Sequence, residues 1–274
     1  MVGIRASGMC RSDLKFYRTL KGGDPSIGIR LAGPVVAGHE PCGLVEAVGS
    51  SVDPRQAKVG GRVTVHHVHG CDCCRTCRSS WLQICDNGPA AIYGITANGG
   101  YAAFLKAAAS SIVQLPDSLS FKTGAAVACG TGTAYSALTR LNVSGDDTLI
   151  VVGQGSVGLS ATLLASSMGA RVVTLDIEPN RLERARTFGA AHNIDPNDGN
   201  PVDAILDLTA GHGAECAMDA SGSNHGRQTA LRATREWGRM CVVGEGHDLH
   251  LDISADMLRR QRTILGSWVF SIMG

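Results

Sequence analysis

The loop from Gly70 to Cys85 carries the densest group of potential metal ligands in the sequence. Cys71, Cys74 and Cys77 are each separated by two residues, and Cys85 follows after seven, so the spacing is C-x2-C-x2-C-x7-C. Four thiolates on one short loop can form a closed tetrahedral zinc site, which is structural because no coordination position stays open. The spacing therefore predicts a structural zinc loop. Unpaired loop cysteines are the alternative, but exposed clustered thiols are prone to oxidation.

Four further side chains near this loop leave alternatives open. Cys73 is a fifth thiol, and it could replace Cys74 only with a first spacing too tight for easy chelation. His66, His67 and His69 stand just before the loop. We interpret them as strand and loop residues. Because histidine is a common ligand, contact of one of them with a metal or a substrate is the alternative.

A glycine turn indicates a second kind of chemistry. Thr148–Val152 is an apolar run without charge, as expected for a buried strand. A G-x-G-x-x-G follows, and a helix is expected from there to Met168, with Gly169 placed to end it. Such a turn binds a pyrophosphate at the helix N-terminus. The motif reads Gly153-Gln154-Gly155-Ser156-Val157-Gly158, and its predicted cofactor-binding residues are Gly153, Gly155, Ser156, Val157 and Gly158.

The three glycines have separate roles in this pattern. Gly153 permits the tight turn, Gly155 lets the backbone approach the pyrophosphate, and Gly158 lets the helix lie close to the strand. A second strand over Ala170–Leu175 ends on Asp176. Its carboxylate can accept hydrogen bonds from both ribose hydroxyls and would repel a 2′-phosphate, so the sequence predicts NAD rather than NADP.

A third set of ligands is dispersed along the chain. Cys10, His39, Glu40 and Cys129 are far apart in sequence, and a single cysteine is more often a small buried hydrophobe. Together they stand at the borders between a β-rich part and the nucleotide unit, where we expect an active cleft. Two thiolates and one imidazole around zinc leave a fourth position open, as catalytic zinc requires.

Composition excludes several classes of protein. The 274 residues allow one large or two ordinary domains, and 44% hydrophobic and 18% charged residues are typical of a folded, soluble chain. The formal net charge of +1 predicts neither nucleic-acid nor membrane binding. There is no membrane-spanning run and no secretory signal, so we expect a cytoplasmic, reducing location. Ten cysteines there indicate metal rather than disulfides.

The elements that must position these residues fall into two kinds. Short strands separated by glycine turns predict an antiparallel, barrel-like β unit in the first part of the chain, with a short helix opening at Gly8–Asp13 and a loop over Leu20–Pro34. Its strands are expected at 1–6, 43–48, 62–65, 102–106 and 112–116. After a partly helical stretch from Phe121 to Leu141, alternating strands and helices predict a six-stranded, doubly wound sheet. Its strands are expected at 148–152, 170–175, 192–194, 215–218, 240–243 and 263–267, and helices from 179, at 202–208 and at 225–233.

At this point the chain resembles the medium-chain, zinc-dependent alcohol dehydrogenases over essentially its whole length. The motifs that carry the resemblance are Gly8–Asp13, Gly38–Glu40, the four-cysteine loop, Cys129-Gly130 and the Gly153–Gly158 turn. The resemblance implies an α/β protein with two domains. Residues 1–130 would form an incomplete GroES-like catalytic domain that lacks N-terminal strands and a C-terminal segment. Residues 131–268 would form a Rossmann domain, and 269–274 would begin the return to the catalytic domain.

The resemblance also implies roles for residues around the catalytic zinc. Cys10, His39 and Cys129 would hold the metal, and Glu40 would lie beside it as a possible further ligand. Ser12 resembles the hydroxyl that hydrogen-bonds the substrate oxygen. Asp13 resembles the partner that orients the zinc histidine, a role with a general physical basis.

For the cofactor, the resemblance implies four contacts outside the glycine turn. Arg11 is similar to the residue that meets the pyrophosphate, and Arg181 to the basic residue near the adenosine ribose. Thr133 falls at the nicotinamide side and Val243 near the nicotinamide amide. Lys15 stands where a histidine completes the proton path in the best-studied members, so the outer relay is expected to differ.

The function implied is an oxidoreductase that transfers hydride between a zinc-bound alcohol, aldehyde or ketone and NAD. One alternative is a polyol, sugar or amino-alcohol dehydrogenase, although an acidic residue often replaces Cys129 in those branches. The other is a non-catalytic NAD-binding relative. The strand at Thr263–Ser267 resembles the dimer-forming strand of the family, so a homodimer or homotetramer is expected. With its ends missing, the chain is expected to bind NAD more readily than it turns over alcohol.

Overall fold

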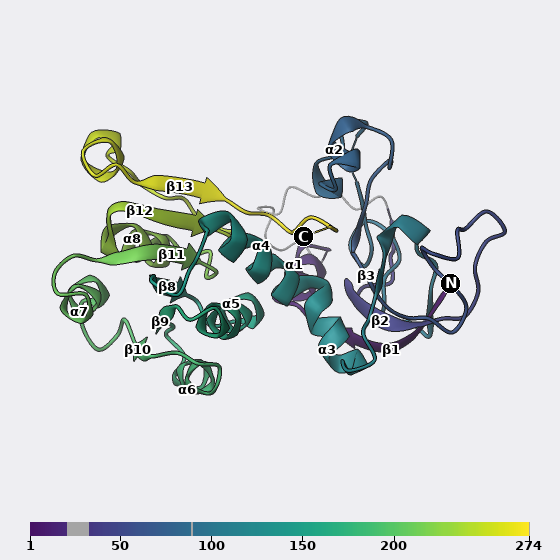
Figure 1. Cartoon of the computed structure of the whole chain (residues 1–274), viewed down its shortest axis with the longest axis horizontal. Helices are drawn as coiled ribbons and strands as arrows, with labels where there is room; N and C mark the ends of the chain where they lie inside the picture. Colours follow the sequence, from purple (N-terminus) through teal and green to yellow (C-terminus); the bar gives the residue numbers. More distant parts are fainter. Residues whose placement is uncertain (21–32, 89, 274) are drawn as a thin grey trace. The chain divides into compact units, whose positions relative to one another are not determined.

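A computed structural model describes residues 1–20, 33–88 and 90–273. The chain divides into two compact units, the first formed by Met1–Gly132 and Val269–Gly274 and the second by Thr133–Trp268 (Figure 1). Within the described ranges, no helix is both long and apolar enough to cross a bilayer. The loop predicted over Leu20–Pro34 falls largely outside the described residues.

The first unit is built on a five-stranded antiparallel sheet in the order β6-β1-β2-β3-β7. The predicted strand at 43–48 lies instead at 40–45, because Glu40 pairs with Gly8 at the far end of β1, whereas Val48 is exposed. The strand predicted at 102–106 is only two residues long. The strands are β1 (Val2–Gly8), β2 (Glu40–Val45), β3 (Arg62–Val65), β6 (Phe104–Leu105) and β7 (Ile112–Gln114).

Short elements surround this sheet. Strands β4 and β5 pair as a separate antiparallel ribbon, and the side chains of Val2, Val45, Val63 and Val65 are buried in the unit's core. The remaining elements are α1 (Arg11–Leu20), β4 (Val68–His69), α2 (Arg75–Arg78), η2 (Leu82–Ile84), β5 (Ala91–Ile92), η3 (Ala109–Ser111), α3 (Phe121–Ala126) and the π turn η4 (Val127–Thr131).

The second unit is a parallel six-stranded sheet in the order β10-β9-β8-β11-β12-β13, drawn from teal to yellow in Figure 1. From β8 the chain moves outward through β9 to β10, then returns to place β11 on the other side of β8. This confirms the predicted doubly wound α/β fold. Its elements are α4 (Gly132–Leu141), β8 (Thr148–Val152), α5 (Ser156–Ser167), β9 (Arg171–Leu175), α6 (Pro179–Thr187), β10 (His192–Ile194), α7 (Pro201–Leu208), β11 (Ala214–Asp219), α8 (Asn224–Ala233), β12 (Thr234–Val242), the π turn η5 (Ile253–Leu258) and β13 (Thr263–Gly266).

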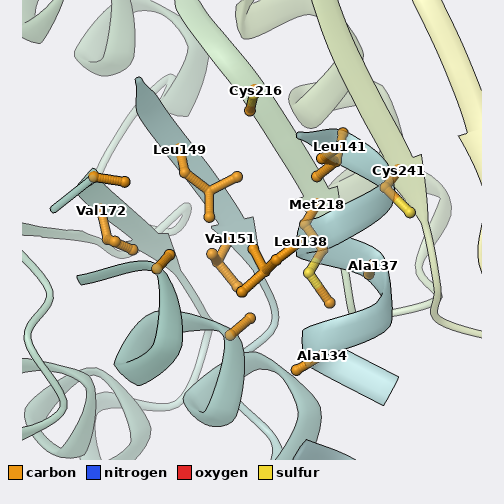
Figure 2. Packing of buried hydrophobic residues seen from close by; sticks show 13 residues of the cluster. Ala134, Ala137, Leu138, Leu141, Leu149, Val151, Val172, Cys216, Met218 and Cys241 are labelled. Carbon is orange, nitrogen blue, oxygen red and sulfur yellow. The ribbon is translucent and has the colours of Figure 1, made fainter. Parts of the chain in front are cut away.

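Both faces of this parallel sheet are covered. Because successive side chains of a strand point to opposite faces, Leu149 and Val151 pack into a cluster with α4 and α5, which Figure 2 shows from close by. Ile150 and Val152 pack into a second cluster with α7 and α8. Burying each such side chain contributes about 1.5–3 kcal/mol, and a strand covered on both faces is apolar throughout.

Strand β12 is longer than predicted. It begins at Thr234, six residues before the expected start at Met240. Its first half contains the charged residues Arg235 and Glu236, so the apolar pattern expected of a buried strand is absent there. The backbone is also irregular, because Trp237 has a positive φ of 60°. The pairing with β11 also shifts register between Ala214 and Cys216.

Candidate active site

The four cysteines predicted to bind structural zinc converge in the first unit. Their ligand atoms all lie within 4.8 Å of one another. Sulfurs at the corners of a zinc tetrahedron lie about 3.8 Å apart, given a zinc–sulfur distance of about 2.3 Å. The Sγ atoms of Cys71 and Cys77 lie 4.0 Å apart, and backbone N–H groups of Cys74 and Cys77 donate to the sulfurs of Cys71 and Cys74 at 3.3 Å. The donor set of Cys71, Cys74, Cys77 and Cys85 fits zinc.

Cys73 stays outside this group. Its side chain is exposed, with its Sγ 3.5 Å from that of Cys71. Gly70 leaves the room that the sulfurs need, because a Cβ at this position would lie 2.4 Å from the Sγ of Cys77.

A second group brings together the dispersed ligands Cys10, His39, Glu40 and Cys129, whose ligand atoms also lie within 4.8 Å of one another. Cys10 lies between β1 and α1, His39 directly precedes β2, and Glu40 is the first residue of that strand. Cys129 lies on the π turn η4. Such turns recur at functional sites, where the extra residue per turn redirects a side chain. All four elements belong to the first unit.

Asp13 contacts the candidate zinc histidine inside the first unit. Its Oδ1 lies 2.9 Å from Nδ1 of His39, and the two side chains are 5% and 3% exposed. Its Oδ2 accepts from the backbone N–H of Cys10 at 2.8 Å. A carboxylate that accepts from Nδ1–H leaves Nε2 free for a metal and raises the basicity of the ring. The sequence-derived role of Asp13 therefore has a geometric basis.

Tyr101 also belongs to this site, although the sequence analysis missed it. Its hydroxyl lies 3.1 Å from Oδ2 of Asp13 and 3.0 Å from the carbonyl oxygen of Gly8. Two glycines make room here: a Cβ at Gly38, where φ is +95°, would lie 2.5 Å from the Tyr101 ring, and one at Gly8 would lie 1.8 Å from Oε2 of Glu40. An aromatic residue directly after two glycines was the available signal.

The predicted dinucleotide turn has the expected form in the second unit. Gly153 has a φ of +87°, which only glycine adopts readily. A Cβ at Gly158 would lie 1.8 Å from the carbonyl oxygen of Gly153, whereas one at Gly155 would meet open space. Asp176 is buried, and its oxygens accept from the N–H groups of Gln154 at 2.6 Å and Glu178 at 3.0 Å.

The remaining predicted residues are divided between the two units. Ser12, in α1, has its Oγ 3.7 Å from the Sγ of Cys10, and Arg11 is exposed at the first position of that helix. In the second unit, Ser156 and Val157 open α5, Thr133 is buried in α4, Val243 directly follows β12, and Nη1 of Arg181 lies 3.6 Å from Oδ2 of Asp176.

Comparison with known proteins identifies this combination. Residues 1–117 match the alcohol dehydrogenase GroES-like domain, and residues 156–273 match the zinc-binding dehydrogenase family. The uncharacterized zinc-type alcohol dehydrogenase-like protein YphC of Escherichia coli is 38% identical over 99% of this chain and 77% of its own length. The chain belongs to the zinc-type alcohol dehydrogenases. This confirms the resemblance, and with it an oxidoreductase of a family whose cofactors are zinc and a nicotinamide dinucleotide.

Other relatives show the breadth of this family. Sorbitol dehydrogenase of Bacillus subtilis is 32% identical over 89% of this chain and 67% of its own length. The solved structure of the alcohol dehydrogenase TADH from Thermus sp. ATN1 superposes with a TM-score of 0.88 at 28% identity, over 98% of this chain and 76% of that one. The dehydrogenase described here thus spans roughly three quarters of the length of the YphC and TADH proteins.

The side chains of Cys10, His39 and Cys129 shift one another's pKa values in different directions. The hydrogen bond with Cys129 and the contacts with His39 outweigh burial and lower the pKa of Cys10 to about 4. The same hydrogen bond, together with burial, raises the pKa of Cys129 well above its usual value. For His39, bonds to Asp13 and Cys10 overcome burial and raise the pKa to about 10. Without metal, His39 and Cys129 therefore hold protons at neutral pH.

Glu40 has a carboxyl group that titrates near neutrality. Burial, followed by the negative charge of Cys10, raises the pKa of Glu40 to about 7. A carboxyl with such a pKa can change its protonation state near neutral pH, and its oxygen lies within reach of the same ligand atoms.

Two of the three histidines before the cysteine loop pack next to the group of Cys10, His39, Glu40 and Cys129. Nδ1 of His67 donates to the carbonyl oxygen of Ala128 at 3.0 Å, and its ring centroid lies 5.4 Å from that of His39. Burial, and then the charge of His39, lower the pKa of His67 to about 3, so it stays neutral. His66 stacks on His67 with ring centroids 5.6 Å apart. In the described part of the chain, these two and His69 join neither group of metal-binding side chains.

Proposed function

We propose that this dehydrogenase oxidises an alcohol, or reduces the corresponding carbonyl compound, with NAD. Cys10, His39 and Cys129 would hold the catalytic zinc, with Glu40 beside it. Zinc there would act as a Lewis acid on the substrate oxygen, and the nicotinamide ring would exchange hydride with the substrate carbon. The observation that carries the proposal is the convergence of these buried ligand atoms within 4.8 Å.

The donor set supports a catalytic rather than a structural assignment for this group. Two thiols and one imidazole provide three protein ligands, which leaves a position open in a tetrahedral shell. By contrast, the loop group offers four thiols, which close the shell. The buried Asp13 carboxylate on Nδ1 of His39 is the kind of orienting contact that zinc histidines require.

Ser12 and Glu40 are the groups that would handle the substrate proton. Ser12 is half-buried, with its Oγ 3.7 Å from the Sγ of Cys10, so its hydroxyl borders the ligand group. A hydroxyl can accept the proton of an alcohol while it donates its own. Glu40, with a pKa of about 7, can change charge as ligands exchange.

NAD is favoured over NADP by the carboxylate at the end of β9. Two backbone N–H groups hold Asp176 in place, so its oxygens present a fixed negative charge to a ribose. Such a charge accepts hydrogen bonds from the 2′- and 3′-hydroxyls and repels a 2′-phosphate. Arg181 lies against the same carboxylate, 43% exposed, where it can contact the adenosine end.

A polyol is the second candidate substrate. Sorbitol dehydrogenase is 32% identical to this chain, and the solved structure of galactitol-1-phosphate dehydrogenase from Escherichia coli superposes with a TM-score of 0.85 at 25% identity. Both act on polyhydroxylated compounds, as their names state. Cys129, in the place where such branches often carry an acid, favours a simple alcohol.

We further propose that the dehydrogenase forms a homodimer or a dimer of dimers. Strand β13 is the last strand of the parallel sheet, so one of its edges offers backbone donors and acceptors to a second copy. Sedimentation equilibrium tests this: a single species of monomer mass at micromolar concentration would contradict it.

The proposed activity is tested with primary, secondary, aromatic and sugar alcohols, each with NAD and with NADP. Zinc content and NADH binding are measured on the same protein, so that loss of activity can be traced. We expect NADH formation with at least one alcohol, and a higher kcat/KM with NAD than with NADP. Preference for NADP, or NADH binding without a second zinc ion, would contradict it.

A further inference from the structure

We propose that Arg227 is a positioning residue for the nicotinamide half of the dinucleotide, which rests on the proposed NAD-dependent function. Arg227, near the start of α8, has a side chain only 9% exposed. Its Nε donates to Oδ2 of Asp219 at 3.0 Å, and its Nη2 donates to the carbonyl oxygen of Gly244. Asp219 ends β11 and Gly244 follows β12, so one buried guanidinium links the loops at the ends of two neighbouring strands.

These loops lie where a doubly wound sheet binds its ligand. The chain leaves β8 toward β9 and later returns to β11, so the switch point of the sheet falls between β8 and β11. In such sheets the ligand lies across the carboxyl ends of the strands at this point. The segments at these carboxyl ends are Gly153 after β8, Asp219–Gly222 at the end of β11, and Val243–Gly244 after β12.

The order of the strands identifies which half of the dinucleotide the link affects. Asp176 follows β9, and the glycine turn follows β8, so the adenosine ribose and the pyrophosphate are assigned to that side. In the order β9-β8-β11-β12, Asp219 and Gly244 lie on the opposite side of the glycine turn from Asp176. A dinucleotide laid across these ends places its nicotinamide half over the loops that Arg227 links.

The Asp219 carboxylate is fully used inside the protein. Oδ1 of Asp219 accepts from the backbone N–H of Ser221 at 2.9 Å and from the Ser221 hydroxyl at 2.7 Å. Oδ2 of Asp219 accepts from Nε of Arg227. The carbonyl oxygen of Asp219 also accepts from the N–H groups of Val243 and Gly244 at 2.9 Å. Asp219 and Arg227 therefore hold the two loops together. Both carboxylate oxygens of Asp219 already accept hydrogen bonds from the protein, so we assign Asp219 no direct contact with a ligand.

The loops pack so closely that a change in one must move the others. A Cβ at Gly153 would lie 2.8 Å from Cα of Ser221, and one at Gly222 would lie 2.4 Å from the carbonyl oxygen of Glu245. Close-packed backbone has no free volume to absorb a shift. Releasing Gly244 from Arg227 thus alters the surface presented to the nicotinamide half.

Arg227→Lys tests the proposal. Lysine keeps the positive charge beside Asp219, but its single ammonium group lacks the planar fork that serves the carboxylate and Gly244 together. The dissociation constants of NADH and of ADP-ribose are measured by fluorescence and by calorimetry. Because ADP-ribose lacks only the nicotinamide, we expect the NADH constant to rise about threefold to tenfold, as for one lost hydrogen bond, and the ADP-ribose constant to stay unchanged.

Arg239→Lys is the matched control at the opposite end of the same sheet. Nε of Arg239 donates to the carbonyl oxygen of Leu141 at 2.7 Å, and its Nη2 donates to the Asp147 carboxylate at 3.2 Å. Asp147 directly precedes β8, on the amino side of the sheet. This variant removes the same kind of link and should leave both dissociation constants unchanged.

The outcomes separate the possible causes. If Arg227→Lys weakens both ligands equally, or neither, or if Arg239→Lys weakens NADH as much, the positioning role is overturned. Should Arg227→Lys fail to fold, Asp219→Asn, which keeps the shape and one acceptor, must show the same split between the ligands. Wild-type protein that binds neither ligand contradicts the proposed NAD-dependent function itself.

Discussion

Nδ1 of His39 lies 2.9 Å from Oδ1 of Asp13, and both side chains are almost completely buried. The pair determines which ring nitrogen is available to a metal. Asp13→Asn keeps the shape but loses the charge that makes the imidazole a strong ligand. We expect zinc affinity at this site, or activity, to fall about 10- to 100-fold, as for other such contacts. Chelator competition measures it.

Asp53→Asn is the control for that substitution. Asp53 pairs with Arg55 on the surface of the same unit, where an ion pair contributes little. It should leave zinc retention unchanged. Equal zinc loss from both variants would remove Asp13 from its proposed role.

Zinc uptake at the catalytic group should strengthen as pH rises. In the metal-free protein the pKa of His39 is raised to about 10 and that of Cys129 lies well above its usual value, so both protons must leave when the metal binds. Each released proton raises the apparent affinity about tenfold per pH unit. Chelator competition between about pH 6.5 and 8.5 measures the slope, and a flat profile would rule out this proton count.

The same His39 shift affects the stability of the metal-free fold in the opposite direction. Because the pKa of His39 in the folded protein is raised above the ordinary histidine value of 6.5, the charged imidazole stabilises the fold fully below that pH. The contribution is lost as pH rises toward about 10. Below about pH 9 this loss is opposed by Cys10, whose lowered pKa of about 4 adds stability as pH rises. The metal-free protein should therefore melt at lower temperature as pH rises above about 9, where, within the ligand group, only the His39 and Cys129 contributions still change, and a Tm that increases there would contradict the assignment.

The cysteine loop offers a matched pair of substitutions. Cys74→Ser removes one of the four converging sulfurs, so we expect loss of one zinc ion per chain and a lower Tm. Cys73→Ser changes an exposed thiol two residues from Cys71 and should retain zinc and Tm. Metal analysis and thermal unfolding give both readouts. Zinc loss from Cys73→Ser with retention in Cys74→Ser would reverse the ligand assignment.

Two glycines of the dinucleotide turn should respond differently to alanine. A Cβ at Gly158 lies 1.8 Å from the carbonyl oxygen of Gly153, so Gly158→Ala should destabilise the fold by about 1–3 kcal/mol as well as weaken NADH binding. At Gly155 the Cβ meets open space and φ is −77°, so stability should hold while the methyl obstructs the pyrophosphate. Denaturant unfolding and NADH titration separate the two effects. Unchanged NADH binding in Gly155→Ala would place the pyrophosphate elsewhere.

The sequence predicted the parts of the fold that depend on local pattern. The run Thr148–Val152, the glycine turn and the acid at Asp176 specify their structure through spacing alone, and the structure has all three. The four cysteines of the loop lie within fifteen residues of one another, so their convergence follows from chain length. Strand ends were predicted less well. Strand β12 begins six residues before its predicted start, and the prediction missed this part because its residues are charged and its backbone is irregular.

Long-range geometry was beyond the sequence pattern. Nothing in the run Val127–Thr131 signals a π turn, yet this turn carries Cys129 to Cys10 and His39. Tyr101 reaches Asp13 across 88 positions of sequence, a contact that depends on tertiary packing at Gly38. The Arg227–Asp219 ion pair was missed for the same reason. From sequence alone an arginine in a helix is expected to be exposed to solvent, and only the tertiary structure shows that Arg227 is buried.

We propose that Cys10, His39 and Cys129 share one zinc ion, while the cysteine loop holds another. Metal analysis of the purified dehydrogenase tests it most directly, with the double variant His39→Ala, Cys129→Ser beside the wild type. We expect two zinc ions per wild-type chain, one for each converging group, and one in the variant. A single zinc in the wild type, or two retained in the variant, would contradict it.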